Sequence, residues 1–84
     1  MTNNKYKILL VEDEENIRTF VSALLGANGY RAIPAKTCAE AKTLYFSHVP
    51  DLVLLDLGLP DRDGGELIRV IRAKDPTPII VLSA

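Results

Sequence analysis

The segment Lys7-Ile-Leu-Leu-Val-Glu-Asp-Glu-Glu15 decides the fold, because a short apolar run ends abruptly in four acidic residues. An apolar run of this length without polar alternation is typical of a strand buried on both faces of a parallel sheet. Apolar residues then recur at helical spacing, and Gly29 stands where a glycine that ends a helix is expected. These helical positions are Ile17, Phe20, Val21, Leu24 and Leu25.

The rest of the chain continues the same alternation of strand and helix. Residues 30–35 form a weaker strand pattern, and Pro34 places that strand at a sheet edge because proline cannot donate to a ladder. Three further features extend the pattern: a capping-box helix opened by Thr37-Cys-Ala-Glu40, the apolar run 52–55 that ends in Asp56, and a helix after Asp63 followed by a fourth strand at 79–82. Strands that alternate with helices predict an α/β fold, a doubly wound parallel sheet with helices on both faces.

Composition limits the protein to one ordinary globular domain. The chain has 84 residues, of which 48% are hydrophobic and 25% charged, and its formal net charge of −1 offers no basic surface for nucleic acid. The polar start and the short apolar run after it predict neither a signal peptide nor a membrane span, so we expect a cytoplasmic protein. Cys38 is the only cysteine and predicts no internal disulfide. Because an apolar strand is followed only by Ser83 and Ala84, we expect residues 1–84 to be an incomplete domain, either truncated or followed by disordered residues.

Acidic residues follow two of the predicted strands at the points where ligands bind in open parallel sheets. If the strand order is 2-1-3-4, the first and third strands are neighbours, and Glu12, Asp13 and Asp56 converge. Three carboxylates at close range need a cation, and oxygen ligands suit Mg²⁺. Such an ion would neutralise an incoming phosphoryl group, which Asp56 could attack as a carboxylate nucleophile.

Other phosphate sites have little support in the sequence. Neither a P-loop nor a dinucleotide-binding glycine motif follows the first strand, where acidic residues stand instead. A metal-dependent phosphatase of the haloacid dehalogenase type would need a second aspartate two residues after the nucleophile. That position is Gly58, which argues against this class of enzyme.

Four segments, in order along the chain, resemble bacterial response-regulator receiver domains. They are Val11-Glu-Asp-Glu14, Asp51-Leu-Val-Leu-Leu-Asp56, Leu59-Pro-Asp-Arg-Asp-Gly64 and Pro78-Ile-Ile-Val-Leu-Ser-Ala84. The resemblance implies a flavodoxin-like (CheY-like) sheet of order 2-1-3-4, truncated after the fourth strand. The stretch Asp56-Leu-Gly-Leu-Pro-Asp61, together with Val81-Leu-Ser-Ala84, is similar to the corresponding sequence of the potassium-transport (Kdp-type) regulators of the winged-helix subfamily.

The resemblance also implies a role for each matching position. Asp56 would be the phosphoacceptor, Asp13 a direct Mg²⁺ ligand, Glu12 a ligand through water, the Gly58 carbonyl a third protein ligand and Ser83 the switch hydroxyl. Ala84 matches the small residue that leaves the phosphoryl group accessible. The family's lysine and aromatic switch residue would lie beyond Ala84.

The implied partners are a sensor histidine kinase, a second copy of the protein, and promoter DNA bound through a C-terminal domain that is not in this chain. We expect a phosphoacceptor and not an enzyme with turnover; a receiver-like binding module that is never phosphorylated is the alternative. Without a fifth strand, residues 79–82 form an apolar sheet edge that predicts edge-strand association or domain swapping.

The remaining polar residues have plainer interpretations. Glu14 and Glu15 are expected in the first turn of a helix, and Asp61 and Asp63 in loop and capping positions. His48 and Cys38 are expected to have no chemical role. The basic residues Arg69, Arg72 and Lys74 are expected to form a solvated helix face.

Overall fold

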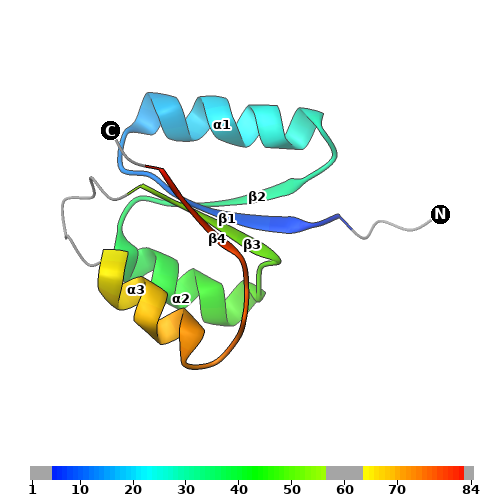
Figure 1. Ribbon diagram of the computed structural model, residues 1–84. Coiled ribbons are helices and arrows are strands. Elements are labelled where there is room, and N and C mark those ends of the chain that lie inside the picture. Colours follow the sequence, from blue (N-terminus) through cyan, green and yellow to red (C-terminus); the bar gives the residue numbers. More distant parts are fainter. Residues whose placement is uncertain (1–4, 57–63, 83–84) are drawn as a thin grey trace.

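The computed structural model describes residues 5–56 and 64–82. In chain order the elements are β1 (Lys7–Val11), α1 (Glu15–Ala27), β2 (Arg31–Ala35), α2 (Cys38–His48), β3 (Leu52–Asp56), α3 (Gly64–Arg72) and β4 (Ile79–Leu82). Helix α1 covers one face of the sheet, and α2 and α3 cover the other (Figure 1). This is the predicted doubly wound α/β architecture.

The four strands form one parallel sheet of order β2-β1-β3-β4, so the predicted order 2-1-3-4 is confirmed. Leu9 pairs with Ile33 on one side and with Val53 on the other. Pro34 lies in β2 at the sheet edge, as its missing N–H requires.

The main core lies between the sheet and helices α2 and α3. Its buried members are Leu9, Val11, Ile33, Ala35, Cys38, Ala41, Tyr45, Val53, Leu55, Leu67 and Ile71. The alternate residues of β1, Ile8 and Leu10, are buried on the opposite face of the sheet, the side of α1. Both faces of the central strand are therefore buried, as its continuous apolar run predicts.

Helix α1 is amphipathic, but its apolar residues are not enclosed. No residue of α1 is buried, and the side chains of Ile17, Phe20 and Leu24 are 48%, 67% and 51% exposed. Among the helices of the described residues, α1 alone lies on its face of the sheet, so the outer half of its apolar stripe has nothing to pack against (Figure 1). No helix in the described ranges is long and apolar enough to cross a membrane.

Local hydrogen bonds set where α2 begins and ends. Thr37 is the N-cap and its Oγ1 accepts the Glu40 N–H at 3.1 Å, while Glu40 accepts the Lys36 N–H at 2.7 Å, so the predicted cap at Thr37 is confirmed. The helix ends at His48, and its C-cap Val49 has a left-handed backbone with φ of 49°. At the same end, Lys7 Nζ donates to the His48 carbonyl at 2.6 Å and so satisfies a terminal carbonyl.

The sharp turn after α1 uses glycine as predicted. Gly29 has a φ of +87°, a conformation that costs glycine little and other residues more. At the other end of the helix, Glu14 is the N-cap and accepts the Asn16 N–H at 3.2 Å, and Glu15 lies in the first turn. These two acids have the structural positions that the sequence indicates for them.

Candidate metal and phosphoacceptor site

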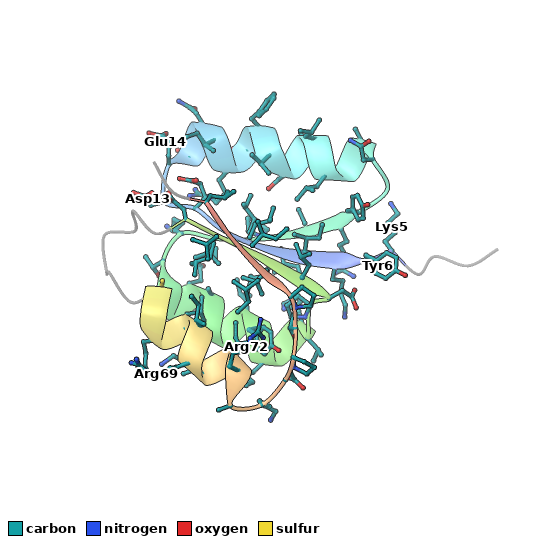
Figure 2. All side chains as sticks on the ribbon, in the orientation of Figure 1. Lys5, Tyr6, Asp13, Glu14, Arg69 and Arg72 are labelled. Atoms are coloured by element: carbon teal, nitrogen blue, oxygen red, sulfur yellow. The ribbon has the colours of Figure 1, made fainter. Side chains whose placement is uncertain are left out.

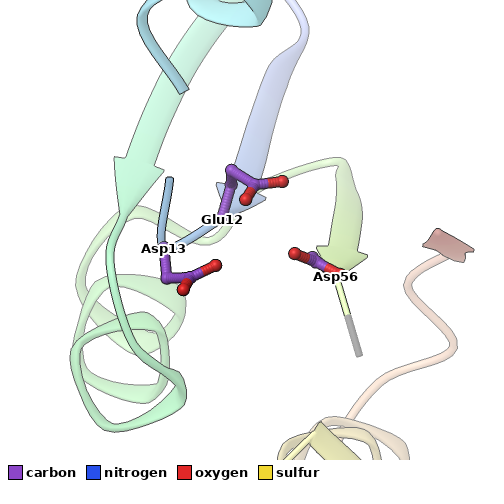
Figure 3. A group of neighbouring side chains, drawn as sticks. All are labelled: Glu12, Asp13 and Asp56. Carbon is purple, nitrogen blue, oxygen red and sulfur yellow. The ribbon is translucent and has the colours of Figure 1, made fainter. Parts of the chain in front are cut away.

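The site lies at the carboxyl edge of the two central strands. Glu12 and Asp13 directly follow β1, and Asp56 is the last residue of β3. Because Val11 pairs with Leu55 in the parallel register, both strands deliver their acidic residues to the same edge. The three side chains point into a common space (Figure 3), and one carboxylate oxygen from each lies within 4.8 Å of the others. The predicted convergence of the three acids is confirmed.

The three carboxylates differ in their exposure to solvent. Glu12 is buried, with 6% of its surface exposed, whereas Asp56 is partly buried and Asp13 is exposed. Burial raises the pKa of the Glu12 carboxyl, and the charge of Asp56, hydrogen bonding to Asp56 and the charge of Asp13 raise it further. The backbone N–H of Glu14, which donates to Glu12 Oε2 at 3.1 Å, acts in the opposite direction. The pKa of Glu12 is therefore raised first by burial and second by the neighbouring acids.

This donor set fits a hard divalent cation. Carboxylate oxygens are the ligands that Mg²⁺ prefers, and Mg²⁺ commonly binds through one or two carboxylates with water completing its octahedron. A dication between the three oxygens would offset the repulsion from Asp56 and Asp13, which adds to the effect of burial on the pKa of Glu12. An exposed Asp13 leaves one side of the site open to solvent and to an incoming group.

The loop that carries Glu12 and Asp13 is held by contacts from two neighbouring elements. The Glu12 N–H donates to the Ala35 carbonyl at 3.0 Å, which continues the β1–β2 ladder by one residue. From α1, Arg18 Nη1 donates to the Glu12 carbonyl at 2.9 Å and to the Asp13 carbonyl at 3.2 Å. Sequence reasoning did not single out Arg18. The available signal was an arginine one helical turn after the acidic run, but spacing alone does not say toward which group a flexible side chain turns.

Several residues expected to belong to the site, or to its surroundings, lie outside the described residues. These are Gly58, Ser83 and Ala84, together with the loop acids Asp61 and Asp63. Their expected roles therefore stay predictions.

The other candidate polar residues are not members of the acidic cluster. His48 is in the last turn of α2, and its Nδ1 is 3.0 Å from Ser47 Oγ. Cys38 is buried and forms no disulfide. Arg69 forms an ion pair with Glu66 on the exposed face of α3, which agrees with the solvated face expected there. Figure 2 shows Asp13 and Glu14 at one end of the molecule, with Lys5 and Tyr6 at the other.

Comparison with known proteins gives a consistent result. Residues 8–84 match the family described as "Response regulator receiver domain". The chain is 45% identical over its whole length to the KDP operon transcriptional regulatory protein KdpE of Escherichia coli, of which it covers 36%. It is 38% identical to the probable transcriptional regulator ycf27 of Porphyra purpurea, of which it covers 35%. The chain therefore spans about a third of the length of these curated relatives.

Solved structures show the same relationship. The non-phosphorylated HemR receiver domain of Leptospira biflexa superposes with a TM-score of 0.86 at 40% identity, over 95% of this chain and 65% of that chain. The BeF3-activated N-terminal receiver domain of Klebsiella pneumoniae RstA superposes with a TM-score of 0.84 at 35% identity, over 92% of this chain and 66% of that one. The similarity to Kdp-type regulators and to CheY-like receiver folds that the sequence predicted is confirmed.

Proposed function

Because this chain belongs to the response regulator receiver family, we propose that Asp56 accepts a phosphoryl group from the phosphohistidine of a sensor histidine kinase. The observation that carries the proposal is the convergence of the Glu12, Asp13 and Asp56 oxygens within 4.8 Å at the carboxyl edge of β1 and β3. Asp56 is the member of the three that ends a central strand, so its backbone is held by the sheet while its side chain reaches the open edge.

The chemistry needs a carboxylate nucleophile and compensation of negative charge. An Asp56 oxygen forms a bond to phosphorus as the phosphorus–nitrogen bond to the donor imidazole breaks, and the imidazole nitrogen keeps the bonding electron pair. Mg²⁺, when bound, would neutralise charge on the transferring phosphoryl group. Glu12 and Asp13 would hold the ion beside Asp56, with the Gly58 carbonyl and Ser83 hydroxyl as further expected contributors.

The proposal extends to the whole protein. The relatives KdpE and ycf27 are named as transcriptional regulators. We therefore expect residues 1–84 to be the first part of a receiver domain, followed by a C-terminal winged-helix domain through which a homodimer binds promoter DNA in the cytoplasm. Potassium-transport genes are the expected targets, because the KDP operon regulator is among the relatives.

The test is phosphorylation of the full protein by a small phosphodonor such as acetyl phosphate, with and without Mg²⁺, followed by intact-mass spectrometry. We expect a single Mg²⁺-dependent phosphoryl adduct that hydroxylamine removes, as it does an acyl phosphate. Asp56→Ala should abolish the adduct, whereas Glu15→Gln, which changes a first-turn acid outside the cluster, should retain it. An adduct that persists in Asp56→Ala overturns the assignment. No adduct in the wild-type protein would instead favour the binding module that is never phosphorylated.

We also infer that β4 is an association surface whenever no further strand covers it. Ile80, Val81 and Leu82 lie at the edge of the sheet with exposed fractions of 47%, 42% and 43%. An exposed apolar sheet edge offers its unpaired N–H and C=O groups to another chain, for edge association or domain swapping. We expect the 84-residue chain to be larger than a monomer in multi-angle light scattering at micromolar concentration, and Ile80→Lys to restore the monomer. A wild-type chain that is monomeric under these conditions contradicts the inference.

A further inference from the structure

We propose that Arg18 is a positioning residue for the acidic loop, and that it aligns the Glu12 and Asp13 carboxylates for a divalent cation by fixing the backbone that carries them. The inference deepens the function proposed above and rests on it. Arg18 itself donates to two main-chain carbonyl oxygens, so it acts on the site through Glu12 and Asp13.

The two bonds constrain the loop at its turning point. Arg18 Nη1 lies 2.9 Å from the Glu12 carbonyl oxygen and 3.2 Å from that of Asp13, and a single Nη1 carries one hydrogen for each. The Arg18 N–H also donates to the Glu14 carbonyl at 2.9 Å within the helix. The start of α1 and the acidic loop are thereby joined into one unit.

The loop needs such a constraint because its side chains repel one another. Glu12 is buried and Asp13 is exposed, and one carboxylate oxygen from each lies within 4.8 Å of an oxygen of Asp56, so the like charges repel. The Ala35 carbonyl holds the N–H of Glu12, but that bond fixes only the start of the loop. The Arg18 contacts fix the following two peptide groups, which carry the Glu12 and Asp13 side chains toward Asp56.

The positive charge of Arg18 should weaken cation binding, whereas its two hydrogen bonds should strengthen it. A guanidinium next to a cation site disfavours the bound cation by simple electrostatics. Removing the charge alone would therefore strengthen Mg²⁺ binding, whereas removing the two hydrogen bonds would weaken it. The direction of the change in affinity distinguishes a positioning role from a purely electrostatic one.

The experiment is titration of the full protein with MgCl₂, with the backbone carbonyl and amide NMR shifts of Glu12 and Asp13 as the readout. Arg18→Gln removes the charge and shortens the side chain, and Arg18→Lys keeps the charge but offers one donor atom on a different stem. Arg31→Gln is the matched control, because Arg31 is an exposed arginine at the start of β2, the opposite end of the sheet. Thermal unfolding of each variant confirms that it is folded.

We expect Arg18→Gln to weaken Mg²⁺ binding about tenfold, the lower end of the effect of removing groups that orient metal ligands. Arg18→Lys should restore part of the affinity, and Arg31→Gln should equal the wild type. In the free protein, the carbonyl shifts of Glu12 and Asp13 should move in Arg18→Gln and not in the control. Unchanged or tighter binding in Arg18→Gln overturns the inference.

The design separates this inference from the proposed function. If wild-type protein binds Mg²⁺ and Asp13→Ala abolishes binding while Arg18→Gln leaves it unchanged, the metal site stands and the role of Arg18 is wrong. If wild-type protein binds no Mg²⁺ at millimolar concentration, the proposed site fails and the inference fails with it.

Discussion

Replacing Asp13 by asparagine should stabilise the metal-free protein and destabilise it, relative to wild type, once Mg²⁺ is present. The carboxylate oxygens of Glu12, Asp13 and Asp56 lie within 4.8 Å of one another. At that separation each pair of charges repels by about 1 kcal/mol in a water-like dielectric and about 3.5 kcal/mol at an effective dielectric of about 20. Because Asp13 is exposed, the lower figure applies, and salt reduces it further. Loss of two such repulsions should raise the free energy of unfolding by about 1–2 kcal/mol.

Bound Mg²⁺ reverses the order of stability of Asp13→Asn and the wild type. An ion present at 100 times its dissociation constant adds about 2.7 kcal/mol to the folded state that binds it. Wild-type protein gains this stabilisation, while Asp13→Asn has lost a charged ligand and gains little. The measurement is urea unfolding followed by far-ultraviolet circular dichroism. It is made once in EDTA and once in saturating MgCl₂, on the order of 10 mM.

The control variant is Glu15→Gln, which removes an acid from the first turn of α1. It should lower stability slightly in both buffers, by about 0.3–1 kcal/mol, because it loses its interaction with the helix dipole. Two outcomes would refute the reasoning. One is that Asp13→Asn destabilises the metal-free protein; the other is that Mg²⁺ stabilises Asp13→Asn as much as it does the wild type.

Three further substitutions test other features of the fold and site. Val49→Gly should stabilise the protein by about 0.5–1 kcal/mol, since Val49 is 62% exposed and holds a left-handed backbone that costs a β-branched residue more than glycine; a lower urea midpoint would contradict this. Tyr45→Phe should cost about 1–3 kcal/mol in urea unfolding, because the buried hydroxyl donates to Asp75 at 3.0 Å and lies 2.7 Å from Thr77 Oγ1; an unchanged stability would show that water replaces these bonds. The raised pKa of Glu12 means that, around that pKa, the folded state binds more protons than the unfolded state. In EDTA, this contribution to the free energy of unfolding is therefore complete below pH 4.5, the ordinary pKa of the group. It is lost as the pH rises through the raised pKa of the folded state. Glu12→Gln should flatten that part of the stability–pH curve, and an unaltered curve would assign the effect to another group.

The sheet and the acidic cluster were predictable because both depend on periodicity and position. The apolar runs at 7–11 and 52–55 are too continuous for exposed strands, and adjacency of these strands places Glu12, Asp13 and Asp56 together. The position of Pro34 at a sheet edge followed from its missing N–H.

Other features depend on tertiary geometry that no local pattern encodes. The left-handed backbone at Val49 contradicts the preference of a β-branched residue, and the neighbouring Lys7–His48 contact joins positions 41 residues apart in the sequence. Likewise, the direction in which the Arg18 side chain turns depends on where the β1–α1 loop lies. Helical spacing places Phe20 on an apolar stripe, which alone would predict that it is buried. It is exposed because, within the described residues, α1 is the one helix on its face of the sheet.

The two edges of the sheet differ in a way that limits how copies of the protein could assemble when no further strand covers β4. The β2 edge contains Pro34, which cannot extend a ladder of hydrogen bonds, whereas the exposed β4 edge consists of Ile79–Leu82. If two copies associate by edge pairing, as proposed above, β4 would pair with β4, and a two-fold axis would make those strands antiparallel. Such a contact uses the same surface of both copies and leaves only two proline-containing edges outside. Such a contact would close as a dimer, so edge pairing of this sheet should give pairs and not the open filaments that a head-to-tail contact between different edges would produce.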